Sequence, residues 1–242
     1  IEASVKAHAG EQLVAYDGFE YLAGRIQRGR TGLGWSGGWK SVGLRRHGRV
    51  GQVVDAPRDT AFGVRRAGRR LLRLAGGEAI RRDLDRPLPL RAGSTYFLSF
   101  LVRRHTGDAT SGRTLLVSLY SGDRHRGRRA RHELAFGVSS EGYPLLRTSG
   151  RIRVSAPAID DDATYLFVAK VAVLADGSTE TYLRAYRPGE VVPVHEPRAW
   201  SITDRAGSAS FAISRVRMYV GENAIFDIDE LRVGTAWRSV TA

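Results

Sequence analysis

The sequence predicts an all-β protein in which two antiparallel sheets pack face to face as a jelly-roll sandwich. Short apolar runs alternate with polar residues in a period of two, which is the period of a half-buried strand. Turn residues, mostly glycine, separate these runs, and no stretch shows the apolar stripe of a helix. About ten to thirteen short strands without crossover helices favour a double-sheet jelly roll.

The clearest strands alternate regularly and end at turn residues. In the run from 96 to 102, tyrosine, leucine, phenylalanine and valine occupy every second position. Similar runs cover Thr114–Tyr120, His132–Val138, Phe211–Val220 and Ala224–Gly234. The segments Leu71–Leu74 and Ile80–Leu84 are weaker, because each is also compatible with one turn of a helix.

One hairpin is predicted with particular clarity. Two β-rich runs, Ala163–Leu174 and Thr179–Tyr186, flank the dipeptide Asp176-Gly177. Asp-Gly supplies the positive φ angles that a tight hairpin turn requires. The two runs are therefore expected to pair.

Composition narrows the class of protein. The chain has 242 residues, of which 42% are hydrophobic, enough for a sizeable core without disulfides. It contains no cysteine, which excludes thiol catalysis, iron–sulfur clusters and zinc sites built on thiolates. No run approaches about 18 apolar residues, which argues against membrane insertion.

We expect residues 1–12 to form a linker or processed N-terminal segment and residues 13–242 to form one jelly-roll domain. Charged and small residues interrupt any periodicity before Leu13, and no boundary signal follows it. The chain begins at Ile1 without a basic-then-apolar signal segment, so we expect it to be part of a longer protein.

Arginine dominates the charge. Lys plus Arg number 38 against 25 Asp plus Glu, a net charge of +13, and only Lys6, Lys40 and Lys170 are lysines. A GC-rich coding bias is one explanation, because it raises arginine and glycine together. The other is function, since guanidinium groups suit bidentate binding of carboxylate, sulfate or phosphate. Either origin gives a field that attracts polyanions at low salt.

The densest arginine cluster lies between two predicted strands, in a stretch that we expect to be an exposed loop. Its candidate ligand-binding residues are Arg124, Arg126, Arg128, Arg129 and Arg131. Three interpretations stay open: solvated charge, an acidic polysaccharide or other surface polymer, and nucleic acid. Nucleic acid is disfavoured, because no aromatic residues for base stacking are interleaved with the arginines. A second arginine-rich region extends from Arg45 to Arg82.

No metal or cofactor site is predicted. Asp160, Asp161 and Asp162 offer the oxygen atoms that calcium prefers, but no Asp-x-Asp-x-Asp-Gly loop accompanies them. We interpret them as a solvated acidic turn before a strand. The six histidines form no His-x-x-x-His pair, and the phosphate-binding and dinucleotide-binding glycine motifs are absent.

Two segments at the ends of the domain resemble a known family. Near the start, Gly32, Gly34, Trp35, Gly37 and Trp39 fit the pattern Gly-x-Gly-Trp-x-Gly-x-Trp. Near the end, residues 228–240 read IDELRVGTAWRSV, with isoleucine where the family most often has phenylalanine. The chain thus resembles the concanavalin A-like, laminin-G-like jelly-roll domains of bacterial surface or envelope proteins, some of which have an N-terminal FecR-type domain.

This resemblance has structural and cellular implications. It covers nearly all of residues 13–242 and implies that the first and last strands are neighbours, with Val14–Tyr21 beside Ile225–Val233. It also implies an extracellular, cell-surface or periplasmic location. Trp35 and Trp39 then have two interpretations, packing against the sandwich edge, which is favoured, and stacking on a sugar ring as ligand-binding residues.

The same family comparison bears on catalysis. Jelly-roll glucanases of the laminarinase type place Glu-x-Asp-x-Glu on one strand, and the nearest match here is DIDEL at residues 227–231. Alternation puts Asp227, Asp229 and Leu231 on one face and Glu230 on the other, so the third carboxylate is missing. We therefore predict that the protein is not an enzyme.

The leading functional hypothesis is a non-catalytic binding or adhesion module for acidic carbohydrate or another polyanion at the cell surface. The alternative is a structural domain that assembles with copies of itself or packs against its parent protein. A polysaccharide-degrading enzyme is supported only by fold analogy, which is a weak argument because function resides in sites.

Overall fold

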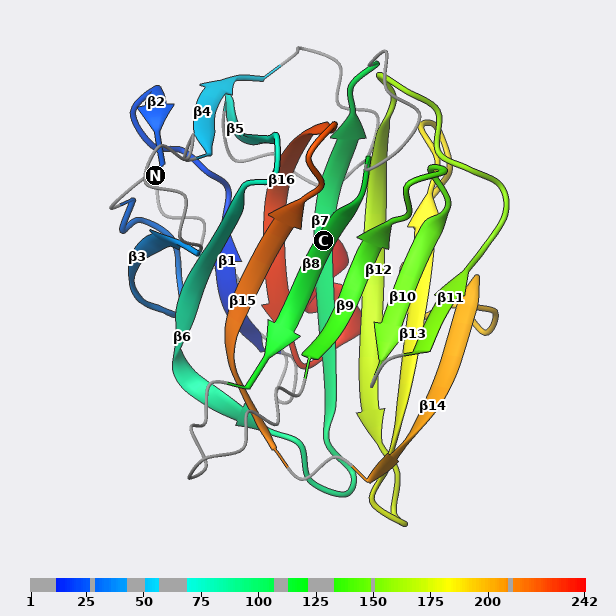
Figure 1. Cartoon of the computed structure of the whole chain (residues 1–242). Helices are drawn as coiled ribbons and strands as arrows, with labels where there is room; N and C mark the ends of the chain where they lie inside the picture. Colours follow the sequence, from blue (N-terminus) through cyan, green and yellow to red (C-terminus); the bar gives the residue numbers. More distant parts are fainter. Residues whose placement is uncertain are drawn as a thin grey trace.

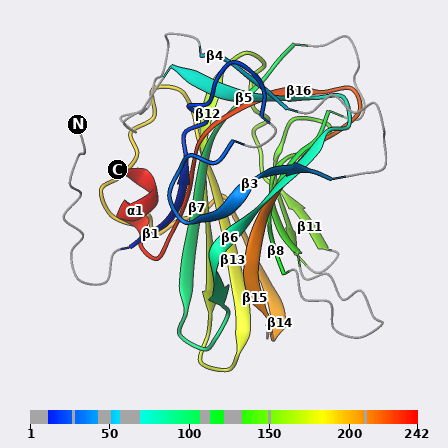
Figure 2. The same cartoon turned by 90° about the vertical axis from the view of Figure 1, so that its left-hand side faces the viewer.

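The computed structural model describes residues 12–26, 29–42, 51–56, 69–106, 113–121, 133–148, 151–208 and 211–242. Within these ranges the chain forms two antiparallel sheets and one short helix, α1 (Trp237–Thr241). The large sheet has nine strands and the small sheet has seven. Figure 1 looks onto the small sheet, and Figure 2, turned by 90°, shows the two sheets as layers. The predicted all-β, two-sheet jelly-roll sandwich is confirmed.

The last long strand lies in the interior of the large sheet. The strand order in this sheet is β14 (Ile202–Ser208), β13 (Ser178–Tyr186), β12 (Thr164–Val173), β7 (Thr95–Arg104), β16 (Ile225–Gly234), β5 (Arg70–Ala75), β4 (Gln52–Asp55) and β2 (Gly24–Arg25). In addition, β1 (Leu13–Asp17) pairs with the second half of β16, where Asp17 lies opposite Leu231. The first and last strands are therefore neighbours, as expected, but β1 pairs only with Leu231–Gly234, and Ile225–Ile228 pairs with β5. The hairpin of β12 and β13 is confirmed.

The small sheet combines strands that the sequence predicted with others that it did not predict. Its order is β11 (Arg151–Val154), β10 (Pro144–Thr148), β9 (Glu133–Val138), β8 (Leu115–Tyr120), β15 (Ala212–Val220), β6 (Ala79–Pro89) and β3 (Trp35–Ser41). The two weakly predicted segments, Leu71–Leu74 and Ile80–Leu84, are strands and lie within β5 and β6. The glycine-rich segment, for which no strand was predicted, ends in strand β3, which pairs with β6.

The core fills the space between the sheets. One continuous cluster of buried apolar side chains joins every second residue of the long strands, including Phe100 of β7, Phe136 of β9, Phe167 of β12 and Met218 of β15. Phe100 and Phe167 stack with ring centroids 5.4 Å apart. Each strand therefore presents its alternate residues to the outer face of its sheet.

A β-bulge in β16 changes which residues of the DIDEL segment share a face. The register with β7 shifts between Asp229 and Arg232, and Glu230 has a positive φ of 49°. Phe226 and Ile228 belong to the core before the bulge, and Leu231 belongs to it afterwards. The expectation that Asp227, Asp229 and Leu231 lie on one face is therefore wrong, because the extra residue of the bulge returns Leu231 to the core.

Helix α1 corrects the expectation of a chain without helices. It packs on the outer face of the large sheet, where Trp237 and Val240 join Phe97, Leu101 and Tyr186 in a second buried cluster. Figure 2 shows the helix on the side away from the small sheet. A helix of five residues is too short to show a periodic stripe. In the described part of the chain no helix is long and apolar enough to cross a membrane.

Candidate functional site

The outer face of the small sheet is the candidate site, and we call its outward side chains on β3, β6, β15, β8, β9 and β10 the arginine face. On β15, Val216 and Met218 point into the core, so Arg215 and Arg217 point outward. On β6, Ile80 and Leu84 are core residues, and the intervening outward residues are Arg81 and Asp83. Outward residues from the other strands complete the arginine face: Tyr120, Glu133 and Arg147.

The strand register brings like charges together in the centre of this face. Arg217 of β15 lies directly opposite Arg81 of β6, and Arg81 lies opposite Lys40 of β3 on its other side. Side chains in such cross-strand positions have Cβ atoms about 4.5–5.5 Å apart, and like charges there destabilise a sheet. Three cations therefore follow one another across adjacent strands.

Neighbouring carboxylates compensate only part of this charge. Asp83 accepts a hydrogen bond of 2.9 Å from Lys40 and lies 3.3 Å from Nε of Arg215, and Glu133 accepts one of 2.9 Å from Arg147. No described residue pairs with Arg81 or Arg217, and the buried Nε group of each has no hydrogen-bond acceptor. A buried donor without an acceptor is rare in folded proteins and costs free energy.

Aromatic and apolar residues lie beside the arginines. The ring of Tyr120 lies under the guanidinium of Arg215, with 5.6 Å between the guanidinium carbon and the ring centroid. Tyr219 packs against a buried apolar cluster on the outer face that includes Leu116 and Leu145. The arginine face therefore combines donors for anionic groups with apolar and aromatic surface.

The arginine-rich loop lies outside the described residues. It joins β8 to β9, and the residues on either side of it, Tyr120 and Glu133, belong to the arginine face. The binding role of Arg124, Arg126, Arg128, Arg129 and Arg131 stays a prediction. In the described part of the second arginine-rich region, Arg70, Arg73 and Arg82 bond to other residues of the domain.

The two candidate tryptophans lie on β3 and bond within the molecule. Trp39 is 3% exposed, and its indole N–H donates to Asp17 over 2.8 Å. Trp35 is half-buried and donates to the backbone oxygen of Tyr16 over 2.9 Å. The packing interpretation accounts for both contacts. A sugar ring would have to displace Trp39 from the core in order to stack on it, whereas Trp35 keeps part of its ring accessible.

Asp17 is the centre of a buried network that fastens β3 to the core. Its carboxylate accepts hydrogen bonds from Tyr21 (2.5 Å), Trp39 and Arg82 (2.6 Å). Arg82 and Asp17 are each 1% exposed, and Arg82 also donates to the backbone oxygens of Gly37 and Thr31. Burial raises the pKa of Asp17, and the hydrogen bonds from Tyr21 and Trp39 oppose this rise. The network is saturated, so we assign it a structural role.

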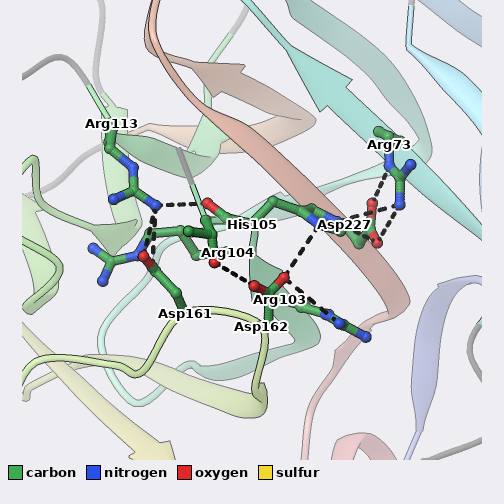
Figure 3. A network of polar contacts seen from close by, with 9 residues as sticks. Arg73, Arg103, Arg104, His105, Arg113, Asp161, Asp162 and Asp227 are labelled. Atoms are coloured by element: carbon green, nitrogen blue, oxygen red, sulfur yellow. Dashed lines mark hydrogen bonds and ion pairs between the residues drawn. The ribbon is translucent and has the colours of Figure 1, made fainter. Parts of the chain in front are cut away.

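A second charged cluster lies at one end of the sandwich (Figure 3). Asp227 accepts two hydrogen bonds from Arg73, of 2.7 and 2.9 Å, and lies 2.7 Å from Nε2 of His105. These bonds raise the pKa of Arg73. Thr106 donates a hydrogen bond to the carboxylate of Asp162, and this bond lowers the pKa of Asp162. Asp161 pairs with Arg104 and Arg113 in the same cluster.

These contacts revise the interpretation of the acidic turn. Asp160 accepts a hydrogen bond of 2.8 Å from Tyr165, and Asp161 and Asp162 bond to cations, so the turn is tied to β7 rather than simply solvated. The described residues contain no group of three or more histidine or acidic side chains placed to hold a metal ion.

The acidic residues of the DIDEL segment are buried and bonded. Asp229, 4% exposed, accepts the backbone N–H of Glu230. Glu230 accepts hydrogen bonds from Tyr16 over 3.2 Å and from Arg232 over 2.9 Å. These bonds fix the bulge where β1 and β5 meet β16, and no sequence pattern predicted this arrangement.

Comparison with known proteins shows a shared fold. No family model matches the chain, and no curated protein matches it. An endo-β-1,4-glucuronan lyase from the fungus Trichoderma reesei has a similar structure, with a TM-score of 0.58, 13% identity, and coverage of 95% of this chain and 98% of the lyase. A carbohydrate esterase from the Shiga toxin-encoding bacteriophage phi24B has a TM-score of 0.50, 9% identity, and coverage of 82% and 90%. At these identities the similarity establishes the two-sheet sandwich fold and nothing further.

Proposed function

We propose that the chain is a non-catalytic module that binds an acidic polysaccharide on the arginine face. The observation that supports this most directly is the pair Arg81 and Arg217, which lie opposite each other with buried Nε groups and no acceptor among the described residues. A carboxylate or sulfate group over the half-buried guanidinium groups accepts hydrogen bonds from their terminal nitrogen atoms and reduces their mutual repulsion.

The extent of the face favours a polymer over a small anion. Lys40, Arg81 and Arg217 follow one another across three strands, which are spaced about 4.7–4.9 Å apart in a sheet. A linear polyanion that crosses the strands presents successive anionic groups to successive cations. The rings of Tyr120 and Tyr219, beside the arginines, suit the apolar faces of sugar rings.

The fold shared with a glucuronan lyase supports a polyuronate as the ligand class. Every sugar of such a polymer bears one carboxylate, which matches a row of arginines. Polymers of this kind occur outside cells and in envelopes, so an extracellular or cell-surface location is part of the proposal. We also include in the proposal a bacterial origin, which the family resemblance suggests.

Binding without cleavage is proposed because the acidic groups of the face are already engaged. Asp83 pairs with Lys40 and Arg215, and Glu133 pairs with Arg147. A pair of carboxylates free to act as acid and base or nucleophile is what glycoside hydrolysis requires. A lyase remains the competing function, and the test below detects it.

The test is isothermal titration calorimetry with oligosaccharides of glucuronan and with neutral cello-oligosaccharides. We expect binding only of the acidic series. The double variant Arg81→Gln and Arg217→Gln should weaken binding by at least about tenfold, since a hydrogen bond to a charged group contributes about 1.5–3 kcal/mol. Unchanged affinity in this variant overturns the proposed site.

A matched control removes the same charge elsewhere. Arg25→Gln together with Arg187→Gln deletes two exposed arginines outside the arginine face and should leave the affinity within about twofold. Incubation with glucuronan, followed by ultraviolet absorbance of unsaturated ends, should give no signal. Accumulation of unsaturated products contradicts the non-catalytic assignment and establishes a lyase.

A further inference from the structure

A pocket of about 410 Å³ lies where the two sheets meet at their open edges, and we call it the edge pocket. Its walls come from β11, the edge strand of the small sheet, and from β13 and β14 of the large sheet. Strands β11 and β14 lie on the right in Figure 1. Small-molecule pockets typically measure about 300–1,000 Å³.

The edge pocket is separate from the arginine face. Arg151 and Arg153 of β11 lie opposite the inward-facing residues Thr148 and Leu146 of β10, so they point toward the large sheet. Ile152 and Val154 alternate with them and face outward. A ligand in the edge pocket therefore binds on the side of β11 that faces the large sheet, whereas a ligand of the arginine face binds on the outer side of the small sheet.

Three arginines surround the pocket, and two of them are held in place. Arg153 lies 3.4 Å from a carboxylate oxygen of Asp204, whose side chain is 2% exposed and also accepts a bond from Thr148. Arg205 donates to Asp176 over 2.6 Å and to Ser178 over 3.2 Å. Each guanidinium has five N–H donors, so both keep donors for a ligand.

Arg151 differs from the other two arginines. It is exposed, and no described residue pairs with it, so all its donors are available at the rim of the pocket.

Acceptors line the wall that belongs to the large sheet. The register places Glu180 opposite Arg205 and Tyr182 opposite Thr203. Tyr182 donates its hydroxyl hydrogen to one oxygen of Glu180, and burial raises the pKa of Tyr182 to about 12, so the hydroxyl stays protonated. Because Leu183 of β13 points into the core, Glu180 and Tyr182 lie on the outer face of the large sheet, and the second oxygen of Glu180 and the hydroxyl of the exposed Thr203 line the pocket from that face.

We propose that the edge pocket binds a single uronic acid residue, free or at the end of a chain. Arg151 and Arg153 bind its carboxylate, and Glu180 and Thr203 bind its hydroxyl groups. Arg153 and Arg205 already lie beside Asp204 and Asp176, so Arg151 is the one arginine of the pocket with no carboxylate partner among the described residues, which matches one carboxylate better than a dianion. This assignment does not depend on the arginine face.

The test is an NMR titration of backbone amides with D-glucuronate, D-glucose and sulfate as separate probes. We expect saturable shifts at Arg151–Val154 and Thr203–Arg205 with glucuronate and no saturable shifts there with glucose. Sulfate should bind at least about tenfold more weakly, because it lacks the hydroxyl groups and brings a second charge near Glu180. Equal binding of sulfate, or the absence of shifts with glucuronate, overturns the proposal.

Variants separate the two sites. Arg151→Gln removes an exposed side chain without described partners, so the fold should persist, and glucuronate should bind at least about tenfold more weakly. Arg25→Gln, at the opposite edge of the large sheet, should change nothing. The double variant of Arg81 and Arg217 should also keep glucuronate binding. If that variant loses glucuronate as well, the edge pocket is not an independent site.

Discussion

At the scale of single residues, arginine has three distinct roles that its environment determines. Arg82 is fully buried, and the acceptors around it include a carboxylate and two backbone oxygens. Arg73 forms a two-bonded pair with Asp227 at the rim of the sandwich. Arg81 and Arg217 have no described partner. The same residue type is therefore structural in the first two settings and available to a ligand in the third.

The buried pair gives a prediction about stability. Arg82→Leu leaves the carboxylate of Asp17 buried without its cation, and such a loss typically costs about 3–5 kcal/mol. Urea unfolding should show a loss of this size in the free energy of unfolding. Arg25→Leu, an exposed arginine on β2, serves as control and should change stability by less than about 0.5 kcal/mol. A loss below about 1 kcal/mol for Arg82→Leu contradicts a role for the pair in holding β3.

Sequence could predict that Trp39 packs but not what it packs against. Asp17, Trp39 and Arg82 are far apart along the chain, and no local period connects them. Only the pairing of β1 with β16 and of β3 with β6 brings them within hydrogen-bond distance. A buried Arg–Asp pair also violates the usual expectation that charged residues lie at the surface.

At the scale of elements, alternation predicted long strands such as β7, β12 and β16, but it missed β4, β10 and β14, although each of these contributes a residue to the core. It failed for β11, whose four residues are all exposed, and for α1, which is only five residues long. It also failed for β3, because glycine is depleted in strands. Within β3, Gly37 has a positive φ of 78°, and just before the strand a Cβ at Gly34 would overlap the carbonyl oxygen of Val14.

The β12–β13 turn gives a prediction at this scale. Gly177 has a φ of 79°, a conformation in which a β-branched residue is strained by about 1–3 kcal/mol. Gly177→Val should therefore lower the melting temperature and the free energy of unfolding by a corresponding amount. Gly207→Val, on β14, is the control, because its backbone lacks the positive φ and a Cβ there meets no atom within 4 Å. Equal melting temperatures for the two variants would refute the strained turn.

At the scale of the whole molecule, the charge total was readable from the sequence but its distribution was not. The arginine-rich segments that the sequence singled out lie mostly outside the described residues. The arginine face combines Arg81, which belongs to the predicted Arg45–Arg82 region, with Arg217 from a strand that is distant in the chain. Its central pair depends on the register of β6 and β15, and the bulge between Ile213 and Arg215 contributes to that register. No single-sequence pattern fixes such a bulge.

The arginines of the β8–β9 loop and those of the arginine face should contribute differently to the binding of polyanions. The triple variant Arg126→Gln, Arg128→Gln and Arg129→Gln removes three charges at a cost of at most about 0.5 kcal/mol of stability per substitution, if these loop positions are exposed. It should elute from heparin resin at lower salt than the parent protein, because polyanion affinity depends on the charges neutralised and the counterions released. Its affinity for glucuronan oligosaccharides at about 0.15 M salt should change by less than about threefold, because the proposal assigns their binding to Arg81 and Arg217 and salt weakens the contribution of additional exposed charges. The double variant of Arg81 and Arg217 should show a large loss for the oligosaccharides and should also elute from heparin at lower salt, because heparin carries the carboxylate and sulfate groups that the arginine face is proposed to bind. If the triple variant elutes at the parent's salt concentration, the loop is not the polyanion site and its arginines are better explained by coding bias.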